Sequence, residues 1–553
     1  MGGNNPVVVQ SMTNTNTMDT MATVQQVMDL VEAGCEMVRI TARNKYEAEN
    51  LKKIKAALAE RNCHIPLIAD IHFMPDAAEI AARIVEKVRI NPGNYVDKKT
   101  NERGPVVYSE SLYRQELDNI SLRLKPLLDI CKEYGTAIRI GVNHGSLSDR
   151  VTGRYGDTVE GMVASALEFI DICRYHDFKN LVLSMKSSDV KTMIYAYRLL
   201  TSRMNESGYD YPLHLGVTEA GAGMDARIKS AAGIGELLME GIGDTIRVSL
   251  TENPAHEIPV AKRLVEAFAT PKRVQDYSGN FKYTKRETIN IGGIGKGHHP
   301  VCVFPDMISN KTKSVLPDYY FDIKNQSLKS LYGKEDIVCV QLKVHDSDDM
   351  AAIKIAAGGY PGLLLVDFSE TNNLQDLRSM LFNLKNHDIN NPLVLYKKYS
   401  CSNENLILQS SAEFAYFLTD GLIDGICIDT HHDKSLLPEL MFSILQALGL
   451  RRVKAEFIAC PTCGRTSYDV EGTLKKLTQA LSHLKHLKIG VMGCVVNGPG
   501  EMADADYGYV GSSPGKINLY RKKQVVLRNI DECDALNELI RLIREDGCWE
   551  DEE

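Results

Sequence analysis

The stretch Lys87-Val-Arg-Ile-Asn91 is a short, strand-like run that ends in a polar side chain, and the same pattern recurs from residue 6 to about residue 265. A stretch with helical periodicity usually follows each run. The runs lie at residues 6–11, 37–41, 65–71, 87–91, 137–142, 180–184, 212–217 and 245–250. Eight strand–helix units in about 260 residues predict a TIM (β/α)8 barrel. The structural alternative is a doubly wound open sheet, but no G-x-G-x-x-G motif follows the first run.

The strand ends of this barrel carry many polar side chains. In a TIM barrel the chemistry takes place at the C-terminal ends of the strands and on the loops that follow them. The sequence places these residues there: Asn14, Thr15, Arg39, Asp70, His72, Arg89, Asn91, Asn94, Arg139, Asn143, His144, Lys186, Glu219, Arg247 and Ser249. Arginine binds phosphate oxygens through two parallel hydrogen bonds and lysine adds a point charge, so the five cations predict a small phosphorylated ligand. Alternatively, individual arginines pair with barrel carboxylates.

Two of these strand-end residues are candidate catalytic residues. Glu219 stands between small residues in Gly216-Val-Thr-Glu-Ala-Gly221, which leaves room for a substrate. Its alternative role is to cap the helix that follows, because acidic residues are common in first turns. His72 follows a strand in Ala69-Asp-Ile-His-Phe73, and its alternative role is that of a packed or capping histidine.

Charge and composition exclude several classes of protein. The chain has 64 Lys and Arg against 72 Asp and Glu, a net charge of −8, which argues against a general nucleic-acid binder. No apolar run approaches the ~18 residues of a membrane helix. The first residues have neither a basic nor an apolar segment, so we expect a cytoplasmic protein without a signal or transit peptide. Thirteen scattered cysteines do not resemble a disulfide framework.

Three cysteines near the C-terminus give the strongest signal. Cys460-Pro-Thr-Cys463 presents two thiolates to one ion or cluster, and Cys494 follows in a Gly- and Pro-rich loop that can approach a bulky centre closely. Three thiolates are one short of a full set of four cysteine ligands. Glu501, seven residues beyond Cys494, is the natural oxygen ligand, and such a fourth ligand would leave one iron open to substrate.

Structural zinc, a thioredoxin-like redox pair and chance are the alternatives for this cysteine group. Zinc usually uses two knuckles or adds histidine, and His483 and His486 fall on a helix expected at 474–487. A redox pair at the C-x-x-C would leave Cys494 unexplained. Iron–sulfur is therefore favoured. Strands expected at 488–492, 507–510, 516–519 and 524–527, with a helix at 533–544, indicate a small α+β domain.

The region between the barrel and the cysteines reads as a further α/β domain, similar to a partial barrel. Strands are expected at 301–304, 338–344, 362–367, 392–396, 413–418 and 425–429, and helices at 350–357 and 374–386. The histidine pairs His298-His299 and His431-His432 are interpreted as exposed turns rather than metal sites. Because few chemical groups occur there, we expect a spacer or an interface. The predicted domains are thus 1–267, 268–453 and 454–553.

Seven sequence motifs together resemble the 4-hydroxy-3-methylbut-2-enyl diphosphate synthase family of the non-mevalonate isoprenoid pathway, in its long, three-domain form. They are Gln10-Ser-Met-Thr-Asn-Thr15, Ala69–Phe73, Val88-Arg-Ile-Asn-Pro-Gly-Asn94, Arg139-Ile-Gly-Val-Asn143, Thr245-Ile-Arg-Val-Ser-Leu-Thr251, Cys460–Cys463 and Gly493–Glu501. They cover the barrel and the C-terminal domain, about two thirds of the chain. Residues 268–453 match the extra domain of the long form only in position and general character.

The resemblance implies an oxidoreductase that reductively opens 2-C-methyl-D-erythritol 2,4-cyclodiphosphate and removes water, giving (E)-4-hydroxy-3-methylbut-2-enyl diphosphate. It implies a [4Fe-4S] cluster, with flavodoxin or ferredoxin as electron donor, and we expect a homodimer. The implied cluster ligands are Cys460, Cys463, Cys494 and Glu501. Arg89, Arg139, Asn143, Lys186, Arg247 and Ser249 would hold the diphosphate, and Arg39, Asp70 and Asn91 complete the predicted substrate-binding set.

The same resemblance assigns the catalytic roles. It makes Glu219 the acid that protonates the leaving hydroxyl, with His72 nearby, and it places Asn497 beside the open iron. Since substrate at the barrel mouth must reach the cluster, we expect the C-terminal domain to close over that mouth. Two alternatives remain from the residues: a pterin- or corrinoid-type methyltransferase on a similar barrel, and a non-catalytic scaffold stapled by zinc.

Overall fold

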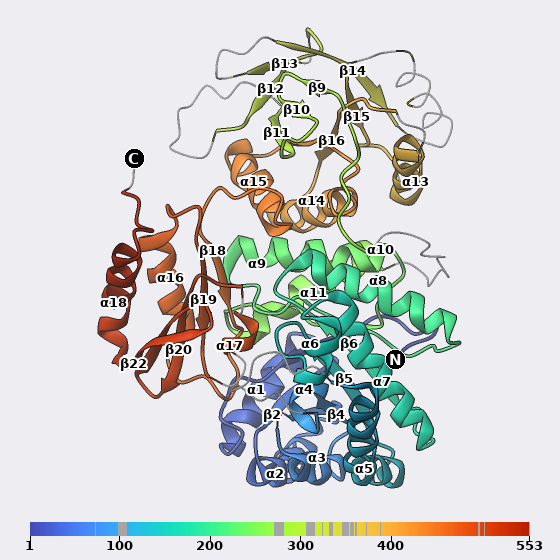
Figure 1. The fold of residues 1–553 in the computed structure, drawn as a ribbon, viewed down its shortest axis with the longest axis vertical. Coiled ribbons are helices and arrows are strands. Elements are labelled where there is room, and N and C mark those ends of the chain that lie inside the picture. The colour runs from blue at the N-terminus through green and yellow to red at the C-terminus, as the bar shows by residue number, and fades with distance from the viewer. Residues whose placement is uncertain are drawn as a thin grey trace. The chain divides into compact units, whose positions relative to one another are not determined.

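The chain folds into two compact units in the computed structural model (Figure 1). The first unit comprises Met1–Ser230, Leu237–Ser278 and Lys454–Glu553, and the second comprises Ala231–Glu236 and Gly279–Val453. The described residues are 1–71, 73–97, 108–269, 281–305, 316–322, 324–330, 336–344, 353, 359, 362–371, 373–386, 389–495, 498–502 and 504–551.

Eight parallel strands form the N-terminal barrel, in the order β6-β5-β4-β3-β2-β1-β8-β7. A parallel bridge between Leu183 and Leu213 joins the two ends of this order. The predicted TIM-type barrel is therefore confirmed. The strands are β1 (Val8–Met12), β2 (Met37–Ala42), β3 (Leu67–Ile71), β4 (Lys87–Ile90), β5 (Ala137–Asn143), β6 (Leu181–Lys186), β7 (His214–Leu215) and β8 (Thr245–Ile246).

Helices follow the strands, and polar caps fix where several of them begin. The Asp19 side chain accepts a hydrogen bond from the N–H of Ala22, and Asn44 caps the next helix in the same way. The helices are α1 (Thr20–Glu32), α2 (Lys45–Glu60), α3 (Pro75–Ala82), α4 (Pro92–Tyr95), α5 (Glu110–Tyr134), α6 (Asp149–Tyr155), α7 (Val159–Tyr175), α8 (Val190–Glu206), α9 (Gly223–Ser230), α10 (Glu236–Met239) and α11 (Glu257–Phe268). These caps hold the strand-to-helix loops at the mouth of the barrel.

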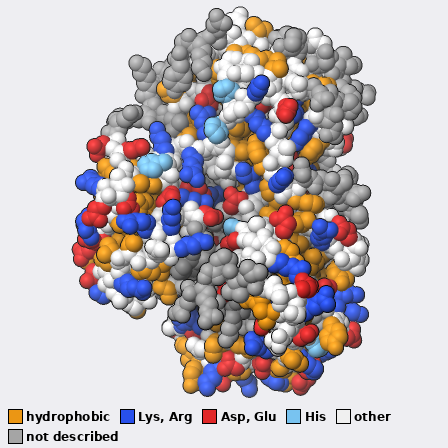
Figure 2. All heavy atoms as spheres, viewed as in Figure 1, with side chains coloured by type: hydrophobic (Ala, Val, Ile, Leu, Met, Phe, Trp, Pro, Cys, Tyr) orange, Lys and Arg blue, Asp and Glu red, His pale blue; other side chains and the backbone are white. Residues whose placement is uncertain are grey.

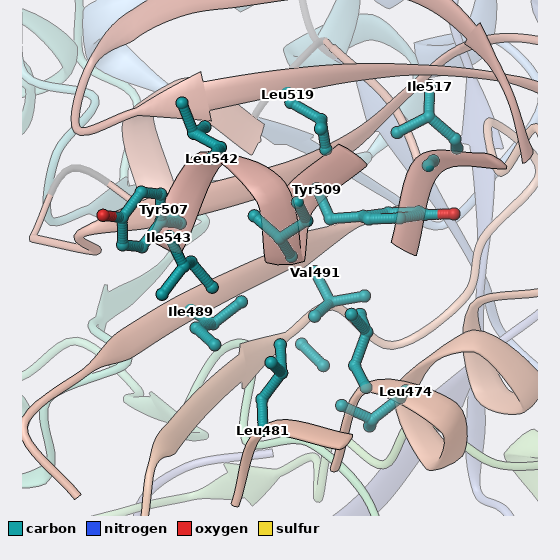
Figure 3. Packing of buried hydrophobic residues seen from close by; sticks show 14 of the residues in the cluster. Leu474, Leu481, Ile489, Val491, Tyr507, Tyr509, Ile517, Leu519, Leu542 and Ile543 are labelled. Carbon is teal, nitrogen blue, oxygen red and sulfur yellow. The ribbon is translucent and has the colours of Figure 1, made fainter. Parts of the chain in front are cut away.

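The C-terminal domain, residues 454–553, contains one five-stranded sheet in the order β18-β19-β20-β21-β22. Its elements are β18 (Glu456–Ala459), α16 (Val470–Leu481), β19 (Lys488–Met492), α17 (Gly498–Glu501), β20 (Tyr507–Ser513), β21 (Lys516–Arg521), β22 (Gln524–Asp531) and α18 (Glu532–Glu545). Figure 3 shows apolar side chains of α16 and α18 meeting those of β19, β20 and β21. This core supports the loops that carry the three cysteines.

The helix expected at 474–487 is displaced in the structure. It spans Val470–Leu481, so His483 and His486 lie beyond its end. Leu484 and Leu487 are buried and continue the apolar spacing, although the backbone there already forms turns. Because the apolar spacing continues beyond the helix, the sequence predicted its C-terminal end too far along the chain.

The second unit is built around a closed barrel of seven strands. They are β11 (Val301–Phe304), β12 (Tyr319–Asp322), β13 (Ser327–Ser330), β14 (Ile337–Lys343), β15 (Leu363–Asp367), β16 (Leu393–Tyr399) and β17 (Gly425–Thr430). Also present are the hairpin β9 (Asn290–Ile291) and β10 (Ile294–Gly295), and the helices α13 (Leu374–Asn386), α14 (Asn403–Leu418) and α15 (Leu437–Ala447). The expectation of an α/β domain is confirmed, and β12 and β13 were not predicted.

One predicted strand in this unit is wrong. Residues 413–418 form the last turns of α14, where every side chain is buried. A helix that is apolar all round shows no period of 3.6, so a short piece of it reads as a buried strand. The helix expected at 350–357 falls almost entirely outside the described residues.

The surface agrees with the charge balance of the sequence. On the face seen in Figure 2, Lys and Arg side chains intermingle with Asp and Glu. None of the helices in the described part of the chain has the length and apolar character to cross a bilayer. Both histidine pairs are exposed, as the sequence predicted.

Candidate active site

One cavity contains residues from the barrel strand ends and from the cysteine loops of the same chain. Its atom-free space, open solvent included, is about 690 Å³. The described residues that line it are Met12, Arg39, Asp70, Arg89, Arg139, Asn143, Lys186, Thr218, Glu219, Arg247, Ser249, Cys460, Pro461, Cys463, Arg465, Met492, Cys494 and Gly498. Thus all five predicted cations, the candidate acid and the three cysteines meet in one place.

The barrel cations are crowded and buried. Arg89 and Arg139 stand directly opposite each other in register on β4 and β5, an arrangement that is destabilising for like charges. Burial and the neighbouring guanidinium groups hold the pKa of Lys186 well below its ordinary value. Burial likewise lowers the pKa of Arg39 to about 10. Cations therefore outnumber carboxylates in the lining, and the site suits a polyanion.

Two of the arginines are fixed from behind by acceptors. Arg89 contacts Asp70 at 3.4 Å and donates to the Gly141 carbonyl at 3.0 Å and to Asn143 Oδ1 at 3.1 Å. Arg247 donates Nε to Glu257 Oε2 at 3.0 Å and Nη2 to Oε1 at 2.9 Å. These contacts orient the guanidinium planes before a ligand arrives, which lowers the cost of binding it.

Two other cations have no such support. In the described part of the chain, Arg139 Nε and Nη1 are buried without a hydrogen-bond partner. Lys186 lies beside Gly216, where a Cβ atom would approach its Nζ to 2.7 Å. Similarly, a Cβ at Gly141 would lie 2.5 Å from Arg89 Nε. Glycine at these two positions makes room for the cationic side chains.

Glu219 adopts an unusual backbone conformation. Its φ is 50°, in the left-handed region that non-glycine residues rarely occupy, and its side chain is buried beside the cavity. The next two residues are bound to the C-terminal domain, because Ala220 pairs with Ala459 of β18 and Gly221 donates its N–H to the Ala459 carbonyl at 3.3 Å. Gly223, the first residue of α9, donates its N–H to the Glu252 side chain.

The three cysteines occupy hydrogen-bonded loops. Cys460 Sγ accepts the Gly493 N–H at 3.1 Å, and Cys463 Sγ accepts Nε–H of Arg465 at 3.3 Å. Such N–H···S bonds are a main determinant of the chemistry of cluster-binding thiolates. Burial raises the pKa of Cys460 well above that of an ordinary thiol, so a metal that binds there must displace a proton.

The spacing of the thiols distinguishes between possible occupants. Within the described residues, no three His, Cys, Asp or Glu side chains are close enough to hold a single metal ion. The three cysteines nevertheless line a common cavity, so they fit a group larger than one ion. A structural zinc site, which needs its ligands about 2.3 Å from one ion, fits this arrangement poorly.

The C-terminal domain meets the barrel mouth through several contacts. Asn14 donates to Thr462 Oγ1 at 2.8 Å, and Thr251 donates to the Cys460 carbonyl at 3.1 Å. Gly464 lies so near the barrel that a Cβ there would approach the Thr15 carbonyl to 2.7 Å. The C-terminal domain thus lies against the barrel mouth in this structure, and the closing motion stays a prediction.

Some predicted site residues lie elsewhere. Asn91 does not line the cavity; its side chain caps α4 and donates to Ser146 Oγ at 3.0 Å. His72 and Asn497 lie outside the described residues, as does the side chain of Glu501, whose backbone is in α17.

Several lining residues were missed from the sequence: Met12, Thr218, Pro461, Arg465, Met492 and Gly498. Met12 ends β1, and Thr218 precedes Glu219, so strand-end position was an available signal for both. The signal for Arg465 was its place two residues after the C-x-x-C motif.

A TIM-type barrel with a cationic mouth, covered by a domain that carries three cysteines, defines a barrel enzyme for anionic substrates with a second, thiol-bearing domain. Residues 1–262 match the GcpE TIM-barrel domain, and residues 456–545 match the GcpE protein C-terminal domain. Relatives match nearly the whole chain as well, and the chain belongs to the GcpE family.

Three relatives carry the name 4-hydroxy-3-methylbut-2-en-1-yl diphosphate synthase (flavodoxin). The protein of Parabacteroides distasonis is 42% identical, over 99% of this chain and 96% of its own length. Those of Porphyromonas gingivalis and Akkermansia muciniphila are each 43% identical over 100% of this chain, covering 96% and 95% of their own lengths. These matches include the inserted region, so the chain has the long form.

Among solved structures, a dihydropteroate synthase from Xanthomonas albilineans is 15% identical with a TM-score of 0.30. It covers 49% of this chain and 96% of its own length. A likeness at this level supports no conclusion about function.

Proposed function

We propose that the chain catalyses the two-electron reductive ring opening and dehydration of 2-C-methyl-D-erythritol 2,4-cyclodiphosphate to (E)-4-hydroxy-3-methylbut-2-enyl diphosphate. The relatives at about 42% identity bear the name of the enzyme that makes this product. The carrying observation is the shared cavity, in which cations suited to a diphosphate face three cysteines. This makes the chain an oxidoreductase of isoprenoid precursor biosynthesis.

The barrel cations bind the diphosphate in this proposal. Arg89 and Arg247 are already oriented by protein acceptors, so they can donate to phosphate oxygens without reorganisation. Arg139 and Lys186 supply charge that the described residues leave uncompensated. Arg39, Asn143 and Ser249 line the same space, and Asp70 acts through Arg89. Asn91 supports the rim through Ser146 rather than by direct contact.

Cys460, Cys463 and Cys494 hold a [4Fe-4S] cluster in this proposal, with Glu501 as the fourth ligand. The fit rests on three thiols around one cavity, on the N–H donors to two of their sulfurs, and on spacing too wide for a single ion. When bound, the cluster would supply the two electrons and an open iron site.

Glu219 is the acid in this proposal. Ring opening leaves a hydroxyl group that departs as water once it receives a proton, and Glu219 lies buried at the cavity wall, one residue before the bridge to the cysteines' domain. In this proposal the proton comes from this buried side chain rather than from solvent. His72 and Asn497 remain predictions for the same step.

The remaining partners are proposals of the same kind. The relatives' names specify flavodoxin, so we propose flavodoxin, with ferredoxin as the other one-electron carrier of similar chemistry. We also propose a homodimer in the cytoplasm, with residues 268–453 as a spacer between the two catalytic domains.

A visible spectrum of anaerobically purified protein tests the proposal. We expect a broad brown band that dithionite bleaches, and conversion of the cyclodiphosphate by the reduced enzyme. A colourless, zinc-containing protein would support the alternative of a non-catalytic scaffold that zinc holds together. A brown protein that binds a pterin and leaves the cyclodiphosphate unchanged would support the methyltransferase.

A further inference from the structure

Arg465 is the cation that the C-terminal domain contributes to the cavity lining among the described residues. Its Nε donates to Cys463 Sγ at 3.3 Å, and its Nη2 lies 3.5 Å from Asp70 Oδ2 on β3 of the barrel. The side chain is only 9% exposed. One guanidinium group therefore joins a candidate cluster ligand to the anion-binding barrel.

The contacts of Arg465 continue into the diphosphate site. Asp70, its barrel partner, also contacts Arg89 Nη1 at 3.4 Å, and Arg89 in turn donates to Asn143. Arg465 Nη1 is buried with no hydrogen-bond partner in the described part of the chain, so one donor remains for a group in the cavity.

A guanidinium group in this position has a defined electrostatic effect. A hydrogen bond from a cation to a sulfur ligand stabilises the more negative, reduced state of the group that the sulfur holds. The effect is large where water is excluded, as it is beside a side chain that is nine-tenths buried. Lysine has one compact ammonium group, which cannot reproduce a fork that reaches sulfur and carboxylate together.

We propose that Arg465 is a positioning residue that raises the reduction potential of the centre held by Cys463 and fixes that centre to the diphosphate site through Asp70. The inference rests on the proposed function, because it requires that the three cysteines hold an iron–sulfur cluster. It adds a residue outside the predicted ligand and substrate sets, with a role that acts through its neighbours.

The test is a redox titration with dithionite, followed by electron paramagnetic resonance, on the full chain loaded with cluster. We expect Arg465→Gln to bind the electron at least about tenfold more weakly, a fall of roughly 59 mV for one electron. Arg465→Lys should recover part of this loss, because it keeps the charge but not the fork. The matched control is Arg541→Gln, which removes an arginine of the same domain that pairs with Glu538 and Glu545 on α18.

The outcomes separate this inference from the proposed function. If the wild-type chain forms no dithionite-bleached cluster, the proposed function and the inference both fail. If the wild-type cluster forms and Arg465→Gln titrates at the same potential, only the inference is overturned. If Arg465→Gln loses its cluster, the Arg465→Lys variant provides the test instead. A reduction potential of Arg465→Lys equal to that of the wild type overturns the role of the guanidinium fork.

Discussion

Arg139 of the first barrel is buried opposite Arg89, and its Nε and Nη1 have no hydrogen-bond partner among the described residues, whereas Lys397 and Lys398 of the second barrel contact carboxylates. Lys397 contacts Glu413 at 2.8 Å, and Asp429 lies 2.9 Å from Lys434 and 3.8 Å from Lys398. Both regions are barrels with polar residues at the ends of parallel strands. The position of a charge in a barrel therefore says less about function than whether its neighbours neutralise it.

The interiors of the two barrels also differ in whether they contain a charged side chain. The seven-stranded barrel is filled by apolar and aromatic side chains such as Phe321, Leu365, Val394 and Tyr396. The N-terminal barrel places Arg139, which is 1% exposed, where such a barrel would ordinarily pack an aliphatic side chain. Under the proposed function, this buried charge would cost stability and contribute to binding, in keeping with the usual trade-off at functional sites.

The largest expected effect comes from removing the candidate acid. Glu219→Gln should lower turnover of the cyclodiphosphate by about 10²–10⁴-fold, because a positioned acid contributes that much. Binding should persist, since the cations hold the diphosphate. Steady-state kinetics with a reduced donor measure the effect. The control is Glu413→Gln in the second barrel, and near-normal turnover of the Glu219 variant would leave this carboxyl without a chemical role.

The second effect separates binding from stability. Arg139→Met should raise KM about 10–100-fold by removing one charged hydrogen-bonding group. The same change should stabilise the fold by about 1 kcal/mol, because it removes a buried cation among cations. Kinetics and urea unfolding on the same preparation measure both. A variant that loses stability would show that Arg139 is a structural residue.

The third effect is a dependence of stability on pH. Lys87 enters the barrel at the start of β4 beside Met37, and burial lowers its pKa to about 7. Its unfolded form keeps the proton up to about pH 10.4, so between these values the unfolded state binds more protons and stability rises with pH. Lys87→Met should abolish this rise and stabilise the fold most below pH 7, by about 1.4 kcal/mol for each unit of pKa shift. Unfolding curves from pH 6 to 10 that are parallel for both proteins would contradict this.

The smallest effect on turnover is expected in the second barrel. Lys397→Met breaks the pair with Glu413 and should cost about 1–3 kcal/mol of stability, while turnover stays within twofold of wild type. Thermal unfolding and kinetics provide the two readouts. A large loss of turnover at unchanged stability would mean that the strand ends of both barrels take part in the reaction.

Much of this architecture could be predicted because strand-like runs and helical periodicity are both visible in short stretches of sequence. Every strand of the first barrel lies within or close to its predicted run, since each run is bounded by polar residues that also mark the mouth. The cations gathered as expected because the register of parallel strands brings their ends together.

The errors arose where local patterns are ambiguous or where distant segments meet. Residues 413–418 of α14 are buried on all sides, so their helical period is hidden. Asn91 ends a strand, yet its side chain turns to cap α4. Arg465 could not be placed, because its contact with Asp70 joins residues 395 positions apart in the chain.

The bridge between Ala220 and Ala459 has a consequence for how this enzyme can vary. Glu219 holds a strained backbone angle one residue before that bridge, so its geometry is encoded jointly by two segments about 240 residues apart. A substitution along β18 that shifts Ala459 therefore also changes the backbone geometry of Glu219, the candidate acid. Sequence changes in the two domains are therefore coupled, and exchanging one of them between relatives must preserve the backbone contacts of Ala459 with Ala220 and Gly221.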